Sequence, residues 1–122
     1  MNDKKIELLT TYLSLYIDHH TVLADMQNAT GKYVVLDVRN APVQVKKDQI
    51  KGAIAMPAKD LATRIGELDP AKTYVVYDWT GGTTLGKTAL LVLLSAGFEA
   101  YELAGALEGW KGMQLPVETL AD

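Results

Sequence analysis

The residues with the clearest chemical potential lie in one loop, Asp78-Trp79-Thr80-Gly81-Gly82-Thr83-Thr84, which follows an apolar run at residues 73–77. Within and beyond this loop, the residues from Gly81 to Thr88 match the pattern G-x-x-x-x-G-K-[ST]. In that pattern backbone N–H groups surround phosphates, the lysine reaches further phosphate oxygens and the hydroxyl holds Mg²⁺. The loop alone therefore allows a nucleotide-binding site or the active-site loop of another class of protein.

The rest of the chain weighs against nucleotide binding. A P-loop hydrolase also needs an acidic residue for Mg²⁺ at the end of a later buried strand. Only 34 residues follow Thr88, and the one later strand-like run, residues 100–103, does not end in aspartate. We therefore keep nucleotide binding by Gly81 to Thr88 as the less favoured interpretation.

Composition and charge narrow the chemistry further. The chain of 122 residues has no cysteine, which excludes a disulfide, a thiolate nucleophile and a sulfur ligand for a metal. Its net charge of −3 does not favour nucleic acid or an anionic membrane as a partner. Lys46, Lys47 and Lys51 are interpreted as a solvated face, and His19 and His20 as solvated residues at a helix start. We expect no metal, no cofactor, and a small molecule or a protein as the partner.

Alternating apolar segments predict the elements that must position the loop. Continuous apolar runs predict buried strands, and apolar residues at helical spacing predict helices between them. The predicted strands are residues 32–38, 52–57, 73–78 and 100–103, and the predicted helices are residues 18–28, 58–68, 83–98 and 105–112. Helix 83–98 is apolar nearly all round and should be buried on most sides. This alternation predicts an α/β fold with a mostly parallel sheet covered on both faces, in which the loop follows the carboxyl end of a strand.

The N-terminal segment, residues 4–17, predicts one more helix with a wide apolar face. One interpretation is that this helix packs on its own domain; the other is that it forms a homodimer or docks on a partner. The segment has neither the clean apolar run nor the cleavage site of a signal peptide, and we expect a cytoplasmic protein. We divide the chain into an N-terminal helical extension, residues 1–14, and one domain, residues 15–122.

Between about residues 17 and 118 the sequence resembles the rhodanese-like (sulfurtransferase) domain family. Four motifs occur in the family's order: Asp37-Val38-Arg39, Ile50-Lys51-Gly52-Ala53 with Met56-Pro57, Leu103 to Trp110, and Leu115-Pro116-Val117. The sequence departs from the family at Asp48-Gln49, where Gly-His is common, and at Ala106, where a second glycine is usual. These departures fall in structural segments and indicate a divergent member.

The resemblance implies a three-layer fold and a catalytic cysteine at the position that Asp78 occupies here. It also implies that the active-site loop is Trp79, Thr80, Gly81, Gly82, Thr83 and Thr84, with Asp37 and Arg39 in a structural role beneath it. Sulfurtransfer needs a thiolate that holds the sulfur as a persulfide, so we expect a protein without this activity, acting as a binding or regulatory module. We further expect the Asp78 carboxylate to accept loop N–H groups and to act as a built-in anion.

Two alternatives remain for Asp78. The loop also has a faint resemblance to that of haloacid-dehalogenase-type phosphohydrolases, in which an aspartate at a strand end is phosphorylated, although Thr80 stands where those enzymes carry a second acid. An engineered exchange of an original cysteine is the other alternative. Trp79, at the loop rim, is interpreted either as an exposed recognition residue or as a lid over the pocket.

Overall fold

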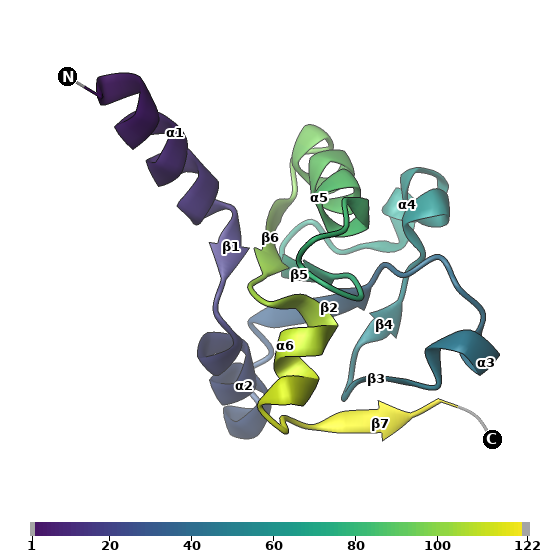
Figure 1. The fold of residues 1–122 in the computed structure, drawn as a ribbon. Coiled ribbons are helices and arrows are strands. Elements are labelled where there is room, and N and C mark those ends of the chain that lie inside the picture. The colour runs from purple at the N-terminus through teal and green to yellow at the C-terminus, as the bar shows by residue number, and fades with distance from the viewer. Residues whose placement is uncertain (1, 121–122) are drawn as a thin grey trace.

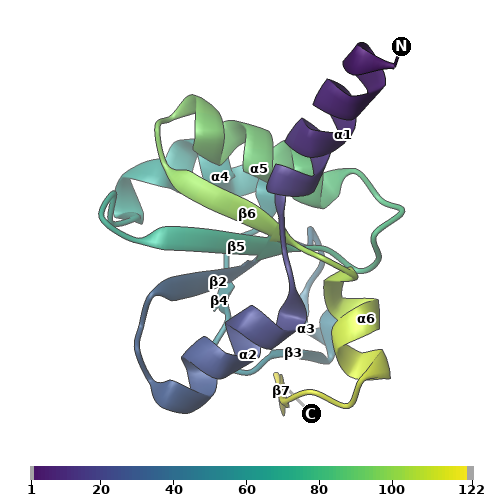
Figure 2. The ribbon, with the colours of Figure 1, turned by 90° about the vertical axis from the view of Figure 1, so that its left-hand side faces the viewer.

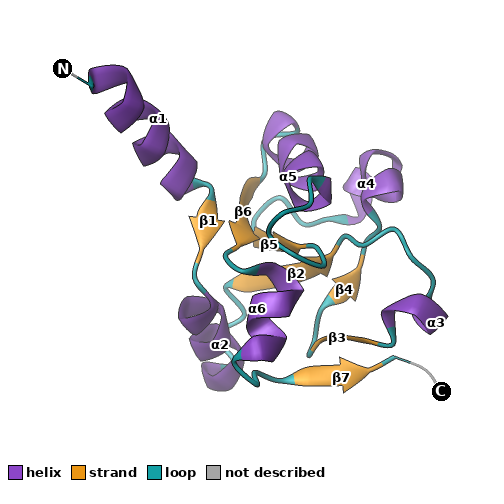
Figure 3. Ribbon diagram, in the orientation of Figure 1, coloured by secondary structure: helices purple, strands orange, loops and turns teal. Residues whose placement is uncertain are grey.

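A parallel sheet forms the centre of the protein (Figure 3). The computed structural model describes residues 2–120, and its five-stranded sheet has the order β1-β6-β5-β2-β4 with every neighbouring pair parallel. The strands are β1 (Tyr16–Ile17), β2 (Tyr33–Asp37), β4 (Ile54–Ala55), β5 (Thr73–Tyr77) and β6 (Glu99–Leu103). A separate antiparallel pair joins β3 (Asp48–Ile50) to β7 (Val117–Thr119). The predicted mostly parallel sheet of about five strands is confirmed.

Helices cover both faces of the sheet, as Figure 2 shows. One face carries α4 (Ala58–Arg64), the short 3₁₀ turn η1 (Ile65–Glu67) and α5 (Leu85–Ser95); the other carries α2 (His19–Asn28) and α6 (Ala106–Gly112). A one-turn helix, α3 (Val43–Lys46), precedes β3. Because each face has its own apolar core, β5 is buried on both sides, which explains its continuous apolar run.

The strand register brings the loops after β2 and β5 together. Asp37, the last residue of β2, is paired with Tyr77 of β5 and with Ala55 of β4. Because the strands are parallel, their carboxyl ends lie at the same edge of the sheet, which is where α/β proteins place their sites. Arg39 and Asp78 therefore follow neighbouring strands at this edge.

The N-terminal segment differs from the prediction. Its helix, α1 (Asp3–Ser14), ends before Tyr16 and Ile17, which form β1 by pairing with Glu102 and Leu103 at the open edge of β6. None of the residues of α1 is buried, and the helix projects away from the domain (Figures 1 and 2). The interpretation that this helix packs on its own domain is therefore wrong.

The environment of α5 also differs from the prediction. Ala89, Leu90 and Leu93 are buried, but Leu91 and Leu94 are 65% and 43% exposed. A helix in an outer layer contacts the sheet through one side, and neither α1 nor α4 covers the opposite side of α5.

None of the helices formed by residues 2–120 is long and apolar enough to cross a membrane.

A substitution at the end of α2 is expected to stabilise the fold. Ala29 caps this helix in the left-handed conformation, with a φ of 52°, and is exposed. Ala29→Gly should raise the free energy of unfolding by about 0.5–1 kcal/mol, because glycine adopts this conformation without a Cβ clash. Urea denaturation measures the change. Ala62→Gly, exposed within α4, is the control and should lower stability by a similar amount; a loss at position 29 would contradict the expectation.

Candidate functional site in the loop after β5

Asp78 is held in place by its own loop. The residue is 1% exposed, and its Oδ1 accepts a hydrogen bond from the backbone N–H of Trp79 at 2.7 Å. Its Oδ2 accepts a hydrogen bond from the Thr83 hydroxyl. Both carboxylate oxygens are therefore engaged within six residues of chain, and the carboxylate is fixed rather than free to move into solvent.

Thr80, Gly82 and Thr83 also form hydrogen bonds with one another within the loop. The Thr83 hydroxyl also lies 3.0 Å from the carbonyl oxygen of Thr80, and the N–H of Gly82 donates to the Thr80 hydroxyl at 3.3 Å. Among the hydrogen bonds of residues 2–120, one backbone N–H of this loop reaches the carboxylate, whereas several were expected. The difference arises because side-chain oxygens of Thr80 and Thr83 take part in the loop's hydrogen bonding. Thr84 is the N-cap residue of α5.

The start of α6 anchors the loop from the other side. The N–H groups of Leu107 and Glu108 donate to the carbonyl oxygens of Asp78 and Trp79 at 3.1 and 3.0 Å. Two consecutive residues with positive φ, Gly105 at 84° and Ala106 at 56°, turn the chain so that these N–H groups face the loop. The left-handed conformation at position 106 gives the physical reason why glycine suits this place, and this chain uses alanine instead.

Asp37 and Arg39 form a buried ion pair beneath the loop. Both side chains are fully buried, Nη2 of Arg39 lies 2.6 Å from Oδ2 of Asp37, and it also donates to the carbonyl oxygen of Asp48. The Tyr77 hydroxyl donates to Asp37 at 2.9 Å and accepts from the N–H of Ile50. Burial, reinforced by the Asp37 carboxylate, raises the pKa of Tyr77, so its hydroxyl remains a neutral donor. The structure therefore places these residues in a hydrogen-bonded network within the protein.

Trp79 lies over this ion pair. Its ring is 4.4 Å from the guanidinium carbon of Arg39, a cation–π contact, while the residue remains 36% exposed. Nη1 of Arg39 is buried and has no hydrogen-bond partner among the described residues, and the ring of Trp79 lies on this guanidinium. Trp79 thus both covers Arg39 and presents part of its ring to solvent.

A pocket of about 350 Å³ opens beside Trp79. Its lining comes from three parts of the chain: Lys46 and Asp48, Trp79 and Thr80, and Leu107, Glu108 and Lys111. Nζ of Lys111 forms a 2.8 Å ion pair with Asp48 at the rim. Lys46 is only 6% exposed, so the interpretation of Lys46, Lys47 and Lys51 as one solvated face is wrong for Lys46. The reason is that Lys46, the last residue of α3, lies in the wall of this pocket together with Trp79 and Leu107.

The residues of the nucleotide pattern are engaged elsewhere. Nζ of Lys87 lies 3.3 Å from Oε1 of the buried Glu102, and the Tyr16 ring is 5.4 Å away. The Thr88 hydroxyl donates to the carbonyl oxygen of Thr84 within α5. Neither side chain is thus directed at the loop to hold a phosphate or Mg²⁺, so the geometry gives nucleotide binding no support.

Removing the Lys87 ammonium tests its role. Glu102 is 2% exposed, and Lys87 is the cation that pairs with it. Lys87→Met should lower the free energy of unfolding by about 1–3 kcal/mol, because a buried carboxylate loses its charged donor. Chemical denaturation measures the loss, with Lys87→Arg as the control that keeps a donor. Equal stability of the two variants would show that the pair does not stabilise the fold.

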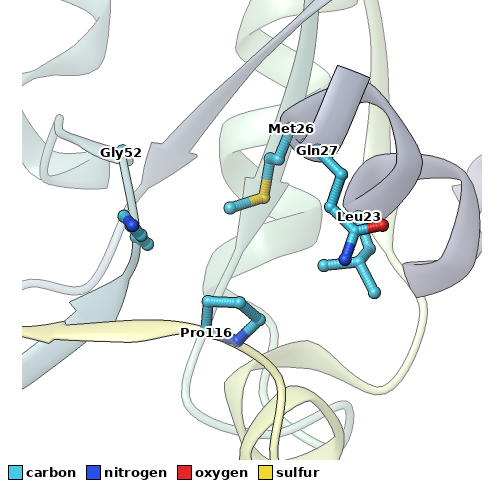
Figure 4. Close-up of a pocket in the computed structure, with 6 residues that line it drawn as sticks. Leu23, Met26, Gln27, Gly52 and Pro116 are labelled. Carbon is cyan, nitrogen blue, oxygen red and sulfur yellow. The ribbon is translucent and has the colours of Figure 1, made fainter. Parts of the chain in front are cut away.

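A second pocket, of about 370 Å³, shares no lining residue with the loop; Figure 4 shows the residues around it. It lies between Leu23, Met26 and Gln27 of α2, Lys51 and Gly52 of the turn after β3, and Pro116. None of the predicted site residues lines it. Among residues 2–120, no group of three or more His, Cys, Asp or Glu side chains is arranged to hold a metal ion.

A model of the rhodanese-like domain matches residues 19–113. The chain belongs to the rhodanese-like domain family. No curated protein matches this sequence.

Several solved structures share this rhodanese-like fold. A crystal structure of a full-length protein from Lactobacillus plantarum is 99% identical, covers 98% of this chain and 100% of its own, and has a TM-score of 0.97. The rhodanese-like domain of the Alr3790 protein from Anabaena sp. is 31% identical over 87% of this chain and 80% of its own, with a TM-score of 0.73. The BH2092 protein from Bacillus halodurans has a TM-score of 0.81 at 24% identity over 98% of this chain and 87% of its own. The last likeness concerns the fold alone.

The rhodanese-like site contains residues that the sequence did not single out as part of it. Lys46, Asp48 and Lys111 line the pocket, and the N–H groups of α6 hold the loop. The charged residues lie outside the apolar patterns and are distant in sequence from the loop, so no spacing rule brings them together. The motif from Leu103 to Trp110 did indicate the α6 segment, but the contacts of α6 with the loop depend on the tertiary fold.

Proposed function

We propose that this rhodanese-like protein does not transfer sulfur and instead uses its loop rim to bind a protein partner. The observation that carries the proposal is the buried Asp78 carboxylate, fixed by the Trp79 N–H and the Thr83 hydroxyl at the strand end where the family motif implies the nucleophilic cysteine. The absence of any cysteine in the chain adds to it.

The chemistry of the missing thiol supports this proposal. A sulfurtransferase thiolate attacks the outer sulfur of a donor, forms a sulfur–sulfur bond and passes that sulfur to an acceptor. A carboxylate oxygen does not form a stable bond of this kind with sulfane sulfur. With no other thiol in the chain, the protein has no group to carry the sulfur.

The charge of Asp78 also opposes the binding of anions in the loop. Thiosulfate and phosphate are anions, and a fixed carboxylate at the base of the loop repels them at short range. The same carboxylate uses the N–H of Trp79, which is then not free to bind an oxyanion. In this proposal the natural loop is occupied by its own anion.

The rim offers features that suit a protein surface. Trp79 is partly exposed and held by its stacking on Arg39, and a fixed aromatic ring loses little entropy on binding. The Asp48–Lys111 ion pair and Glu108 provide a polar border around it. A partly exposed aromatic group with a polar border is typical of protein-binding sites. A cytoplasmic location is part of the same proposal.

Calorimetric titration with thiosulfate tests the occupied loop. The natural protein should give no binding heat, whereas Asp78→Asn, which keeps the shape of the side chain and removes its charge, should bind weakly. Saturable binding of thiosulfate to the natural protein would contradict this part of the proposal. A crystal soak that shows thiosulfate bound in the loop beside Asp78 would contradict it as well.

Site-specific photo-crosslinking in cells tests the protein-binding rim. A benzophenone side chain introduced at Thr80 should give discrete protein adducts, and these should disappear when Trp79→Ala is added. The same group at Ala62, exposed on α4, serves as the control for random collisions. If Thr80 gives no adducts beyond those at Ala62, or if they persist without Trp79, the rim is not the binding surface.

A further inference from the structure

The α1 helix carries an uncovered apolar face. Its large apolar side chains are between 44% and 68% exposed: Ile6, Leu8, Leu9, Tyr12 and Leu13. At about 100° per residue these positions span roughly half of the helix circumference, and the polar residues other than Lys5 share the other half. A single helix of about 12 residues is marginal in water, so α1 needs a surface to pack on, and its own domain buries none of its residues.

The outer side of α5 is a second uncovered apolar face, and it lies close to the base of α1. Leu91 and Leu94 are four and seven residues after Lys87, on the same side of α5. Nζ of Lys87 is 5.4 Å from the centre of the Tyr16 ring, and this ring contacts the ring of Tyr12 in α1 in a tilted arrangement with ring centres 5.3 Å apart. The apolar side of α1 is therefore turned towards the side of the sheet that carries α5.

The two faces do not cover each other. From the sheet edge, α1 diverges from α5 and points away from the domain (Figure 1). The 99% identical structure from Lactobacillus plantarum has a TM-score of 0.97 over 98% of this chain, which requires α1 to project there in the same way. Seven of the thirteen exposed large apolar side chains among the described residues lie on these two helices.

We propose that a second copy of this chain covers both faces, forming a two-fold symmetric dimer. The α1 helices of the two copies pack antiparallel, and each also packs on Leu91 and Leu94 of the other copy's α5. The seven side chains on the two faces together expose an apolar area on the order of several hundred Å² per copy, a size at which exposed apolar surface often marks an interaction site. This approaches the roughly 800 Å² that each partner buries in a standard interface.

The charges on α1 favour an antiparallel second copy. Lys5 is the one charged residue within the apolar half of the helix, and the last turn of α1 has no basic residue. Antiparallel packing puts Lys5 beside the carbonyl end of the other α1, where the helix dipole favours a positive charge. A membrane-surface helix would instead be rich in lysine and arginine, whereas Asp3 and Glu7 balance Lys4 and Lys5 here.

Light scattering with size-exclusion chromatography tests the dimer on the full chain. The natural protein should have twice the chain mass, and Leu9→Asp or Leu91→Asp should each raise the dissociation constant at least about tenfold. These side chains are exposed, so the domain should stay folded, which circular dichroism checks. Val45→Asp, a change at an exposed apolar residue of α3, is the control and should leave the dimer intact.

Cross-linking tests the antiparallel arrangement. Because the chain has no cysteine, Leu9→Cys introduces a single thiol near the middle of α1, which should form a disulfide between copies under mild oxidation. In the same assay Lys4→Cys alone should not, because the two N-termini lie at opposite ends of the helix pair. Efficient cross-linking at position 4 would contradict the antiparallel geometry.

Three results would overturn the dimer proposal. The first is a monomeric mass throughout the range of concentrations at which the protein is soluble. The second is a dimer that neither Leu9→Asp nor Leu91→Asp weakens, which would place the contact elsewhere. The third is a monomer that cosediments with phosphatidylserine-containing vesicles, which would show that α1 packs on a lipid surface instead.

Discussion

Asp78→Cys is expected to produce thiosulfate-to-cyanide sulfurtransfer in this protein, for which we propose that the natural sequence has none. The thiolate would attack the outer sulfur of thiosulfate and release sulfite, and cyanide would then take this sulfur as thiocyanate and restore the thiolate. Its place before the N-terminus of α5 favours the thiolate form. The rate should rise on the order of 10²-fold or more above the uncatalysed background, a small part of a typical enzymatic acceleration. Thiocyanate formation measures it.

The control for this gain of activity is Asp78→Ser, which also removes the carboxylate but introduces no thiol. If only the cysteine variant turns over, the loop retains the geometry of a sulfurtransferase and the natural protein is silenced at one residue. If neither variant does, the loop has diverged beyond sulfur chemistry. Turnover by the unmodified protein would show that the proposed role of Asp78 is wrong.

Arg39→Met is expected to cost about 3–5 kcal/mol of folding free energy, the largest loss of stability predicted for this protein. The substitution leaves the Asp37 carboxylate fully buried without its cation and removes the donor to the Asp48 carbonyl. It also takes away the group on which Trp79 stacks. Urea denaturation measures the stability, and the tryptophan fluorescence of the folded variant should change as the Trp79 ring loses its support.

Two further variants separate the buried pair from a general charge effect. Arg64→Met breaks the exposed pair with Glu67 and should change stability by no more than about 1 kcal/mol. The double substitution Asp37→Leu with Arg39→Met should recover part of the loss, because it leaves no unpaired charge in the interior. Similar effects of Arg39→Met and Arg64→Met would contradict the buried network.

The order and type of the main elements could be predicted from the sequence because the forces involved are local. Buried parallel strands are apolar on both faces, as residues 33–36 and 74–77 are here, and Asp18 accepts the N–H of Thr21 as the N-cap of α2. The family motifs could be placed for the same reason, since they follow the ends of these strands. The absence of cysteine, which limits the chemistry most, is a property of the sequence alone.

The tertiary structure determined which residues distant in the sequence are in contact. The stacking of Trp79 on Arg39 and the pairing of Lys111 with Asp48 join residues 40 and 63 positions apart, which no periodicity encodes. Tyr16 and Ile17 have the apolar character of a helix face, yet they form β1 because the edge of β6 offers backbone hydrogen bonds. The sequence likewise determined that α1 has an apolar face, but whether its own domain covers that face depends on the direction in which the chain leaves the sheet.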